Sequence, residues 1–268
     1  MFEITEVDGF NTRMRQARWL GLVVAGVVIG AAAPAWAFDH SHERFDGVLR
    51  KYVDGGGVRY GALDKDRQSL DSYIQSLGDL PVSEFEKFSR EEAMAFWINA
   101  YNALTLQLIL DKHPSKSIRD IDDPWDKPKF RVVGKAMSLN DIEHETLRKR
   151  FKDARVHAVL VCAAKSCPIL QNRAYVAKDL DQQLNRACQR WARDKTRNRF
   201  DKKDNELQVS KIFSWYGKDF IEQYAARGGG KGVDAAIRGF MREFGELPIS
   251  TDENIAYLDY DWRLNGHW

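Results

Sequence analysis

The feature that most constrains the fold is a long apolar run between Ser89 and His113. Ser89 and Glu92 have the S-x-x-E spacing of a capping box, in which each side chain accepts a hydrogen bond from the other residue's backbone N–H. Pro114 follows the end of the run. The interior reads AMAFWINAYNALTLQLIL and is apolar on nearly every side, which is typical of a helix buried all round. The sequence therefore predicts a central helix over 89–113.

Two asparagines, Asn99 and Asn102, lie within this run and share one face of the predicted helix. A buried amide left unpaired costs about 1–3 kcal/mol, so each should bond a specific partner. In one interpretation the amides tie down a neighbouring loop. In the other, one of them donates to a substrate oxygen or orients a catalytic group. The sequence leaves both open, and both asparagines are candidate catalytic residues.

A second segment, RVHAVLVCAAKSCPIL over 155–170, delivers a cysteine to a loop. Val156–Val161 is almost wholly apolar and rich in β-branched valine, which predicts a strand covered on both faces. Pro168 cannot donate a ladder hydrogen bond, so the strand must stop by there. Cys167 is then expected on an irregular loop at the edge of the core, where active sites are often built.

The two cysteines of this segment allow several chemistries. Cys167 becomes a nucleophile if a cation or hydrogen-bond donor stabilises its thiolate, and Lys165 and His144 are candidates for that neighbour. A disulfide between Cys162 and Cys167 forms only if the loop turns back. A metal site with His157 is weaker, because a straight strand puts His157 and Cys162 on opposite faces and no C-x-x-C occurs. Two plain structural thiols are the remaining alternative.

The chain's best candidate for a general base is His144, because imidazole is the side chain that titrates unperturbed near neutral pH. It falls in a predicted helix that starts near Ser138 and Asp141 and runs through Phe151. The neighbouring Glu143 is expected to point elsewhere on such a helix. A lone histidine on a helix is also compatible with a purely structural role.

The order of the predicted helices and strands, without an internal repeat or low-complexity linker, predicts one folded domain of the α+β class over 38–268. The chain has 268 residues, 44% of them hydrophobic, and a formal net charge of +2, which gives no indication of nucleic-acid binding. The motifs of serine hydrolases, nucleotide-binding proteins and zincins do not occur, and we expect no cofactor and no metal. Three cysteines are too few for a disulfide-built fold, and Cys188 falls on the apolar face of a predicted helix over 177–194.

Residues 1–37 have the pattern of a signal peptide. Three arginines precede the apolar stretch Trp19–Ala33, and Ala35-Trp36-Ala37 is an A-x-A cleavage signal. We expect a periplasmic or secreted protein that has no stable membrane span after cleavage. An uncleaved anchor is the alternative, because the stretch is nearly long enough to cross a bilayer.

Five blocks in order resemble the family called domain of unknown function 547. They read AFWINAYNALTLQLIL, SLNDIEHETLRKRF, RVHAVLVCAAKSCPIL, VSKIFSWYGKDF and YLDYDWRLN, and they cover about 88–265. The resemblance implies a set of recurrent polar positions: Asn99, Asn102, Glu143, His144, Cys167 and Asp261. These are the ingredients of papain-like and transglutaminase-like sites, in which a central helix packs on a mainly antiparallel sheet. Such enzymes carry the cysteine at the start of that helix, so a site here needs a rearranged geometry.

The function expected from these residues is a cysteine-dependent hydrolase or acyl transferase acting on amide or peptide substrates. Cys167 would attack a carbonyl and His144 would take and return the proton. Asn99 or Asn102 would orient His144 or stabilise the oxyanion, and Asp261 is a late-chain partner. The alternative is a non-catalytic binding module of the cell envelope, for a small-molecule or peptide ligand, with structural or bridged cysteines. Thiol redox chemistry is a third class, which the absence of C-x-x-C disfavours.

Overall fold

The apolar run forms helix α5 (Arg90–Lys112) in a computed structural model that describes residues 38–268. The predicted capping box is present, with Ser89 Oγ accepting from Glu92 N at 3.1 Å and Glu92 Oε2 accepting from Ser89 N at 2.8 Å. By length and composition α5 resembles a membrane span, but 94% of its most apolar window is buried inside the protein. The prediction of a central buried helix is confirmed, and the predicted signal peptide lies outside the described residues.

The other α-helices of the described residues are shorter than α5. They are α1 (Glu43–Tyr52), α2 (Tyr60–Asp64), α3 (Gln68–Asp79), α4 (Val82–Phe85), α6 (Leu180–Arg193), α7 (Lys211–Tyr216), α8 (Ile221–Tyr224) and α9 (Val233–Phe240). Short 3-10 helices are η1 (Ile118–Asp120), η3 (Ala154–Ala158), η4 (Ala177–Asp179), η5 (Gly217–Phe220) and η6 (Ala226–Gly228). Two segments are π-helices, η2 (Asp141–Phe151) and η7 (Met241–Gly245).

Strands within residues 38–268 form three small sheets. The strands are β1 (Val53–Asp54), β2 (Gly57–Arg59), β3 (Phe130–Val132), β4 (Lys135–Met137), β5 (Arg199–Asp201), β6 (Glu206–Val209), β7 (Asn254–Tyr257) and β8 (Gly266–His267). The sheet orders are β1-β2-β8, β3-β4 and β5-β6-β7, with antiparallel pairs except for β2/β8 and β6/β7. The α+β class is confirmed. The neighbours of α5 are mostly helices, notably α3 and η2. In place of the one sheet expected against this helix, the strands form three small sheets.

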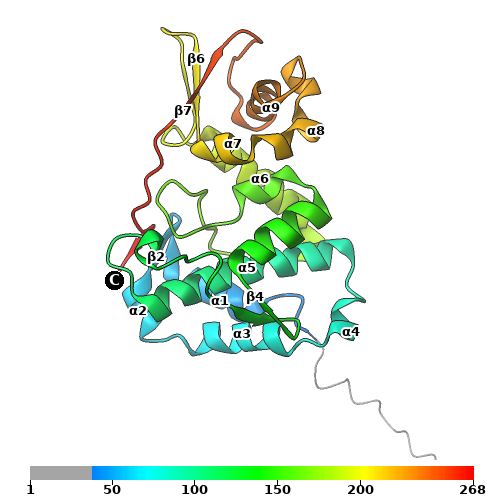
Figure 1. Ribbon diagram of the computed structural model, residues 1–268, viewed down its shortest axis with the longest axis vertical. Helices are drawn as coiled ribbons and strands as arrows, with labels where there is room; N and C mark the ends of the chain where they lie inside the picture. The colour runs from blue at the N-terminus through cyan, green and yellow to red at the C-terminus, as the bar shows by residue number, and fades with distance from the viewer. Residues whose placement is uncertain (1–37) are drawn as a thin grey trace, which may run out of the picture. The chain divides into compact units, whose positions relative to one another are not determined.

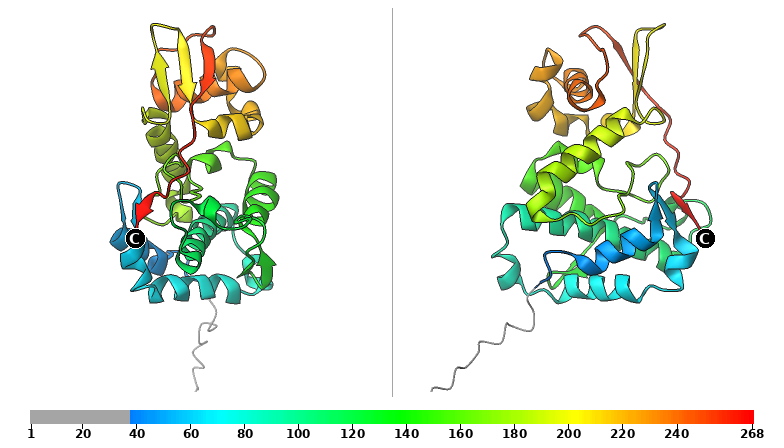
Figure 2. Two further views of the ribbon diagram at one scale, coloured as in Figure 1. Left: turned by 60° about the vertical axis from the view of Figure 1, so that its left-hand side comes forward. Right: turned by 180° about the vertical axis from the view of Figure 1, so that it is seen from behind.

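Helices α1 to α5 occupy one half of the described unit, and α7 to α9 lie in the other half with the β5-β6-β7 sheet (Figure 1). Helix α6 lies between them, as both views in Figure 2 also show. The C-terminal tail leaves β7 in one half and returns to pair β8 with β2 in the other (Figure 1). This path carries the tail across the boundary where the cysteine loop lies.

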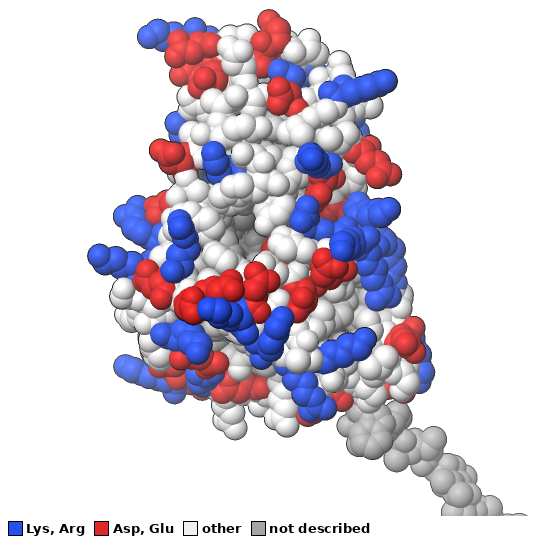
Figure 3. Space-filling view, viewed as in Figure 1, with Lys and Arg blue, Asp and Glu red and all other residues white. Residues whose placement is uncertain are grey.

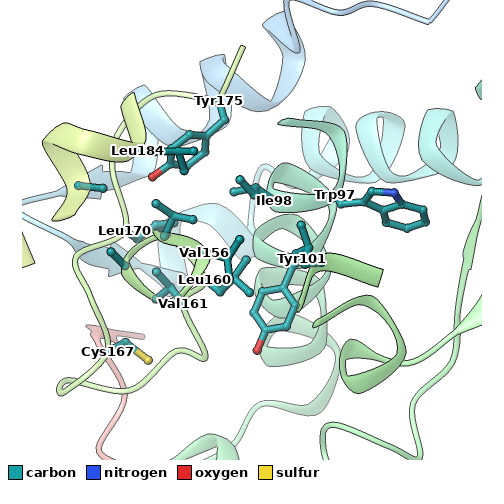
Figure 4. Packing of buried hydrophobic residues seen from close by; sticks show 14 of the residues in the cluster. Trp97, Ile98, Tyr101, Val156, Leu160, Val161, Cys167, Leu170, Tyr175 and Leu184 are labelled. Carbon is teal, nitrogen blue, oxygen red and sulfur yellow. The ribbon is translucent and has the colours of Figure 1, made fainter. Parts of the chain in front are cut away.

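The predicted strand over Val156–Val161 is wrong. Its first part belongs to the 3-10 helix η3, and the chain from Val159 to Cys162 is irregular. Figure 4 shows Val156 and Leu160 directed toward Ile98 and Tyr101 of α5. A short apolar run that is buried on all sides has the same pattern in a strand as in a compact turn, so periodicity alone cannot distinguish them.

Candidate functional site

A cavity of about 350 Å³ opens where the cysteine loop, the π-helix η2, helix α7 and the C-terminal tail meet. Both thiols of the loop, two imidazoles and the carboxylate of Glu143 line it. Most of the remaining wall is aromatic and consists of Tyr101, Trp125, Trp215, Tyr216, Tyr260 and Trp262. On the face seen in Figure 1, the space-filling view shows a hollow with largely uncharged walls and acidic side chains along one border (Figure 3).

The two cysteines of the loop are in direct contact. Both are free thiols, and their Sγ atoms lie 2.7 Å apart. Cys167 Sγ also accepts hydrogen bonds from the backbone N–H of Cys162 at 3.1 Å and from the hydroxyl of Tyr260 at 3.2 Å. Cys167 is buried and 2% exposed, while Cys162 is partly exposed.

These contacts separate the chemical states of the two thiols. Burial alone would raise the pKa of Cys167, but hydrogen bonds from Cys162, from Tyr260 and from the backbone outweigh it and lower that pKa. The same hydrogen bond to Cys167, together with burial, raises the pKa of Cys162. Burial also raises the pKa of Tyr260, which therefore stays a hydroxyl donor. Cys167 is therefore the more acidic thiol of the pair, and Cys162 is the less acidic one.

The loop is held from outside the cavity by the tail and by an arginine. Ser166 exchanges two hydrogen bonds with Asp261, from Ser166 N to Asp261 O at 3.1 Å and from Asp261 N to Ser166 Oγ at 2.8 Å. Arg197 donates to the carbonyl oxygens of Cys167 at 2.7 Å and of Lys165 at 2.6 Å. The position of Cys167 therefore depends on residues that are far from it in sequence.

A histidine–carboxylate pair forms a second part of the site. His157 Nε2 lies 2.8 Å from Asp219 Oδ2, and the ring stacks on Tyr216 with centroids 4.4 Å apart. Burial would raise the pKa of Asp219, but hydrogen bonds and charge from His157 and Arg148 outweigh it and lower that pKa. A carboxylate only accepts hydrogen bonds, so His157 Nε2 carries a proton and Nδ1 remains for proton transfer.

The predicted base, His144, is in the cavity with a different hydrogen-bonding role. Its Nδ1 lies 2.9 Å from Arg148 Nη1, and a guanidinium can only donate. Nδ1 therefore accepts, and the ring proton lies on Nε2. The structure brings His144 and Cys167 to the same cavity, but no hydrogen bond joins them within the described residues. This arrangement makes His144 a hydrogen-bond donor to a bound group.

Glu143 also faces the cavity, so the expectation that it points elsewhere is wrong. The segment Asp141–Phe151 is a π-helix, whose wider i→i+5 turn changes which side chains share a face. Glu143 is 7% exposed, and its Oε1 lies 4.0 Å from His144 Nδ1. Two consecutive residues of η2 therefore contribute to one wall. Such wide turns within helices are frequent at functional sites.

The two asparagines of α5 do not line the cavity, because both amides bond to backbone. Asn99 donates to Tyr175 O at 2.7 Å and accepts from Tyr175 N at 2.9 Å. Asn102 donates to Val159 O at 3.0 Å and accepts from Val161 N at 3.0 Å. Each amide thus bonds one backbone N–H and one backbone C=O of a segment that has no strand neighbour. Both side chains therefore hold backbone segments, as in the first of the two interpretations of the sequence.

Asp261 does not line the cavity either. Its carboxylate accepts from Arg263 Nε at 2.9 Å, and the hydrogen bonds from Arg263 lower its pKa to about 2. Cys188 is fully buried on α6, and burial raises the pKa of its thiol, which fits the predicted core position. No group of three or more His, Cys, Asp or Glu within residues 38–268 is placed to hold a metal ion.

The sequence gives no direct signal for the His157–Asp219 pair or for the contact of Tyr260 with Cys167, and it indicates His157 only as a metal ligand. The other two residues lie in the blocks VSKIFSWYGKDF and YLDYDWRLN, whose polar side chains were the available signal. Nothing in the sequence alone indicates that these distant blocks meet at the cysteine loop.

Comparison with known proteins gives a family and no activity. Residues 85–191 match the model of a family described as "Protein of unknown function, DUF547". The matched stretch contains α5, η2, and the two thiols of the cavity, whereas Asp219 and Tyr260 lie beyond it. No curated protein and no solved structure matches the chain, so the papain-like arrangement stays a prediction.

Proposed function

Because the family whose model matches residues 85–191, described as protein of unknown function, DUF547, names no activity, we propose a function from the cavity. The protein is a cysteine-dependent hydrolase or acyl transferase with Cys167 as its nucleophile. The support for the proposal is a buried cysteine whose sulfur accepts two hydrogen bonds, contacts a second thiol and faces a cavity containing two imidazoles. A nucleophile and a base oriented by a third group are the features of covalent catalysis.

The side chains divide the steps of acyl transfer among them. Cys167 Sγ attacks the carbonyl carbon, and the Nε2–H of His144 donates to the developing oxyanion. His157, supported as an imidazolium by Asp219, gives its Nδ1 proton to the leaving amine, and the C–N bond breaks. Water or an acyl acceptor then loses a proton to His157 and attacks the thioester. This step restores the Cys167 thiolate and the imidazolium.

The acid–base groups are the reason to place acyl transfer first. Thiol–disulfide exchange needs only sulfur atoms and a stabilised thiolate. The cavity also contains His144 and His157, the second of which pairs with Asp219, and such an exchange would leave both imidazoles without a role. Hydrolysis or acyl transfer uses each of them.

The contact between the two sulfurs favours a second candidate, dithiol–disulfide exchange. Cys167 thiolate would attack a substrate disulfide and release one substrate thiolate. Cys162 would then give up its proton to that thiolate and attack Cys167, releasing the second substrate sulfur as a thiolate, which takes a proton from water. The substrate disulfide is reduced to two thiols, and the cysteine pair is oxidised to a disulfide.

One experiment separates these functions. The reduced protein is alkylated with iodoacetamide from about pH 5 to about pH 9 and mapped by peptide mass, with Cys188 as the internal control. Separate samples are exposed to p-nitrophenyl acetate and to oxidised glutathione. Acyl transfer predicts alkylation of Cys167 with an apparent pKa below about 8.5, and an acetyl adduct that is released in the wild type and persists in His157→Gln.

The other outcomes contradict this proposal in different ways. A Cys162–Cys167 disulfide formed with glutathione, without an acetyl adduct, assigns the site to dithiol exchange. A third outcome is that no acetyl adduct and no disulfide forms and that Cys167 reacts with iodoacetamide no faster than Cys188. That outcome would indicate a non-catalytic binding module. A Tyr260→Phe variant that lowers the reactivity of Cys167 at neutral pH supports the stabilised thiolate in both catalytic cases.

We also propose that the mature protein works in the periplasm or outside the cell. The support is the leader pattern of residues 1–37, with Ala35-Trp36-Ala37 as its cleavage signal. Cell fractionation and N-terminal sequencing of the protein purified from its native cells test this location, and we expect a mature chain that begins at Phe38. A chain that retains Met1 and sediments with membranes would instead indicate an uncleaved anchor.

A further inference from the structure

Four aromatic side chains form a continuous rim at the cavity, which we call the aromatic rim: Trp125, Trp215, Tyr260 and Trp262. The ring of Trp262 lies 5.8 Å from Trp125, 5.7 Å from Trp215 and 4.6 Å from Tyr260, measured between centroids. Trp215 is 44% exposed, which is unusual for so large an apolar side chain at the edge of a cavity. The rim comes from three separate parts of the chain, so it is a product of the tertiary fold.

The rim surrounds a cavity that has one acidic side chain in its wall. Glu143 is the carboxylate among the residues that line it, and no lysine or arginine does so within the described chain. The nearby Arg148 is engaged, with Nε 2.6 Å from Asp219 Oδ2 and Nη1 2.9 Å from His144 Nδ1. The carboxylate of Glu143 would therefore repel an anionic ligand.

A positively charged donor pairs favourably with a buried carboxylate such as that of Glu143, because a charge-assisted hydrogen bond is stronger than a neutral one. Aromatic faces also attract cations through the ring quadrupole, most strongly for tryptophan. The outer region of the rim already shows this contact, since the guanidinium of Arg119 lies 5.3 Å from the Trp262 centroid. A ligand that carries an organic cation satisfies the carboxylate and the rim together.

We propose that the substrate carries an alkylammonium group, which Glu143 and the aromatic rim bind beside Cys167. This inference rests on the proposed function. The ammonium donates to the carboxylate while its alkyl chain lies against the indole faces. The cavity of about 350 Å³ has room for a chain the size of a lysine side chain. The charge of the substrate, rather than the thiol chemistry, then decides which acyl group is presented to the nucleophile.

The test measures binding with the chemistry removed. A Cys167→Ser variant is titrated with pentylammonium, with 1-pentanol as the neutral probe of similar size and with pentanoate as the anion, by ligand-observed NMR. We expect pentylammonium to bind at least about tenfold more tightly than pentanol, and pentanoate to bind most weakly. Adding Glu143→Gln should weaken pentylammonium binding about tenfold and leave pentanol unchanged.

Glu145→Gln is the matched control, since Glu145 lies on the same π-helix but is 59% exposed and pairs with Lys149. It should bind pentylammonium as the parent does. Trp215→Leu changes an exposed position of the rim and should also weaken pentylammonium binding. It therefore tests the site even where Glu143→Gln does not fold. Equal binding of pentanol and pentylammonium, or no effect of either site variant, would overturn the proposal.

The outcome is distinguishable from failure of the catalytic proposal. If pentylammonium binds as expected while p-nitrophenyl acetate leaves no adduct on Cys167, the cation site stands and the acyl-transfer function fails. If the adduct forms and turns over while the ammonium binds no better than the alcohol, the nucleophile stands and the substrate class is wrong.

Discussion

The amide of Asn102 offers a direct test of how the cysteine loop is held. It is 3% exposed and bonds both Val159 O and Val161 N at 3.0 Å, just before Cys162. Asn102→Ala removes both hydrogen bonds and leaves a buried carbonyl and a buried N–H without partners. Each such group costs about 1–3 kcal/mol, so we expect a loss of roughly 2–6 kcal/mol in the free energy of unfolding. That is a large part of the 5–15 kcal/mol typical of a folded domain.

The assay is urea unfolding followed by tryptophan fluorescence, with reductant present so that the cysteines stay thiols. Asn99→Ala is the matched comparison, because Asn99 makes the same pair of bonds to Tyr175 at 2.7 and 2.9 Å. Both variants should lose similar stability. The rate of Cys167 alkylation should change in Asn102→Ala and stay near the wild-type rate in Asn99→Ala, since only the Asn102 segment leads into the cysteine pair.

Two results would refute this reasoning. The first is a loss of less than about 1 kcal/mol in the free energy of unfolding of Asn102→Ala, with an unchanged slope of that free energy against urea concentration. It would mean that the amide does not hold the loop. A large drop in acyl-transfer rate with unchanged stability would instead assign Asn102 to the chemistry, which was the other role that the sequence allowed.

Three further predictions concern positions away from the cavity. Burial lowers the pKa of His42 to about 4, so between that pH and its unfolded pKa near 6.5 the unfolded state binds more protons. Stability should fall by about 3 kcal/mol as the pH drops from about 6.5 to about 4, and His42→Gln should reduce this slope in urea unfolding. Gly239→Ala should prevent folding or strongly destabilise it, because the added Cβ would lie 1.9 Å from Tyr224 O, and its soluble yield and melting temperature check this. Gly47→Ala lies in the exposed interior of α1 with nothing within 4 Å of the new Cβ, and it should raise the free energy of unfolding by about 0.5–1 kcal/mol.

Elements with local signals were predictable from the sequence. Helix α5 follows from a capping box, an apolar interior and a terminal proline, all of which act within the segment itself. The hairpin β3-β4 pairs Phe130 with Met137 around a Gly-containing turn. In each case the residues that decide the structure are close together in sequence.

The segment 156–161 shows where local reasoning fails. Its apolar residues indicate burial correctly, but burial does not specify the backbone conformation. The hydrogen bonds that a strand would find in a sheet come from a side chain, Asn102. That substitution of partner depends on α5 lying alongside the segment, which no local pattern can show.

The chemical state of Cys167 is a property of the tertiary fold in the same sense. Sequence proximity suggested Lys165 as the cation that activates the thiol, yet Lys165 is exposed and does not line the cavity. The donors that lower the Cys167 pKa are Cys162, within the loop, and Tyr260, from the C-terminal tail. The same tail fixes Ser166 through Asp261, so one segment both positions the loop and supplies a donor to the sulfur. Reactivity at this site therefore requires the tail to be docked, and a sequence motif confined to the cysteine loop is not sufficient to define it.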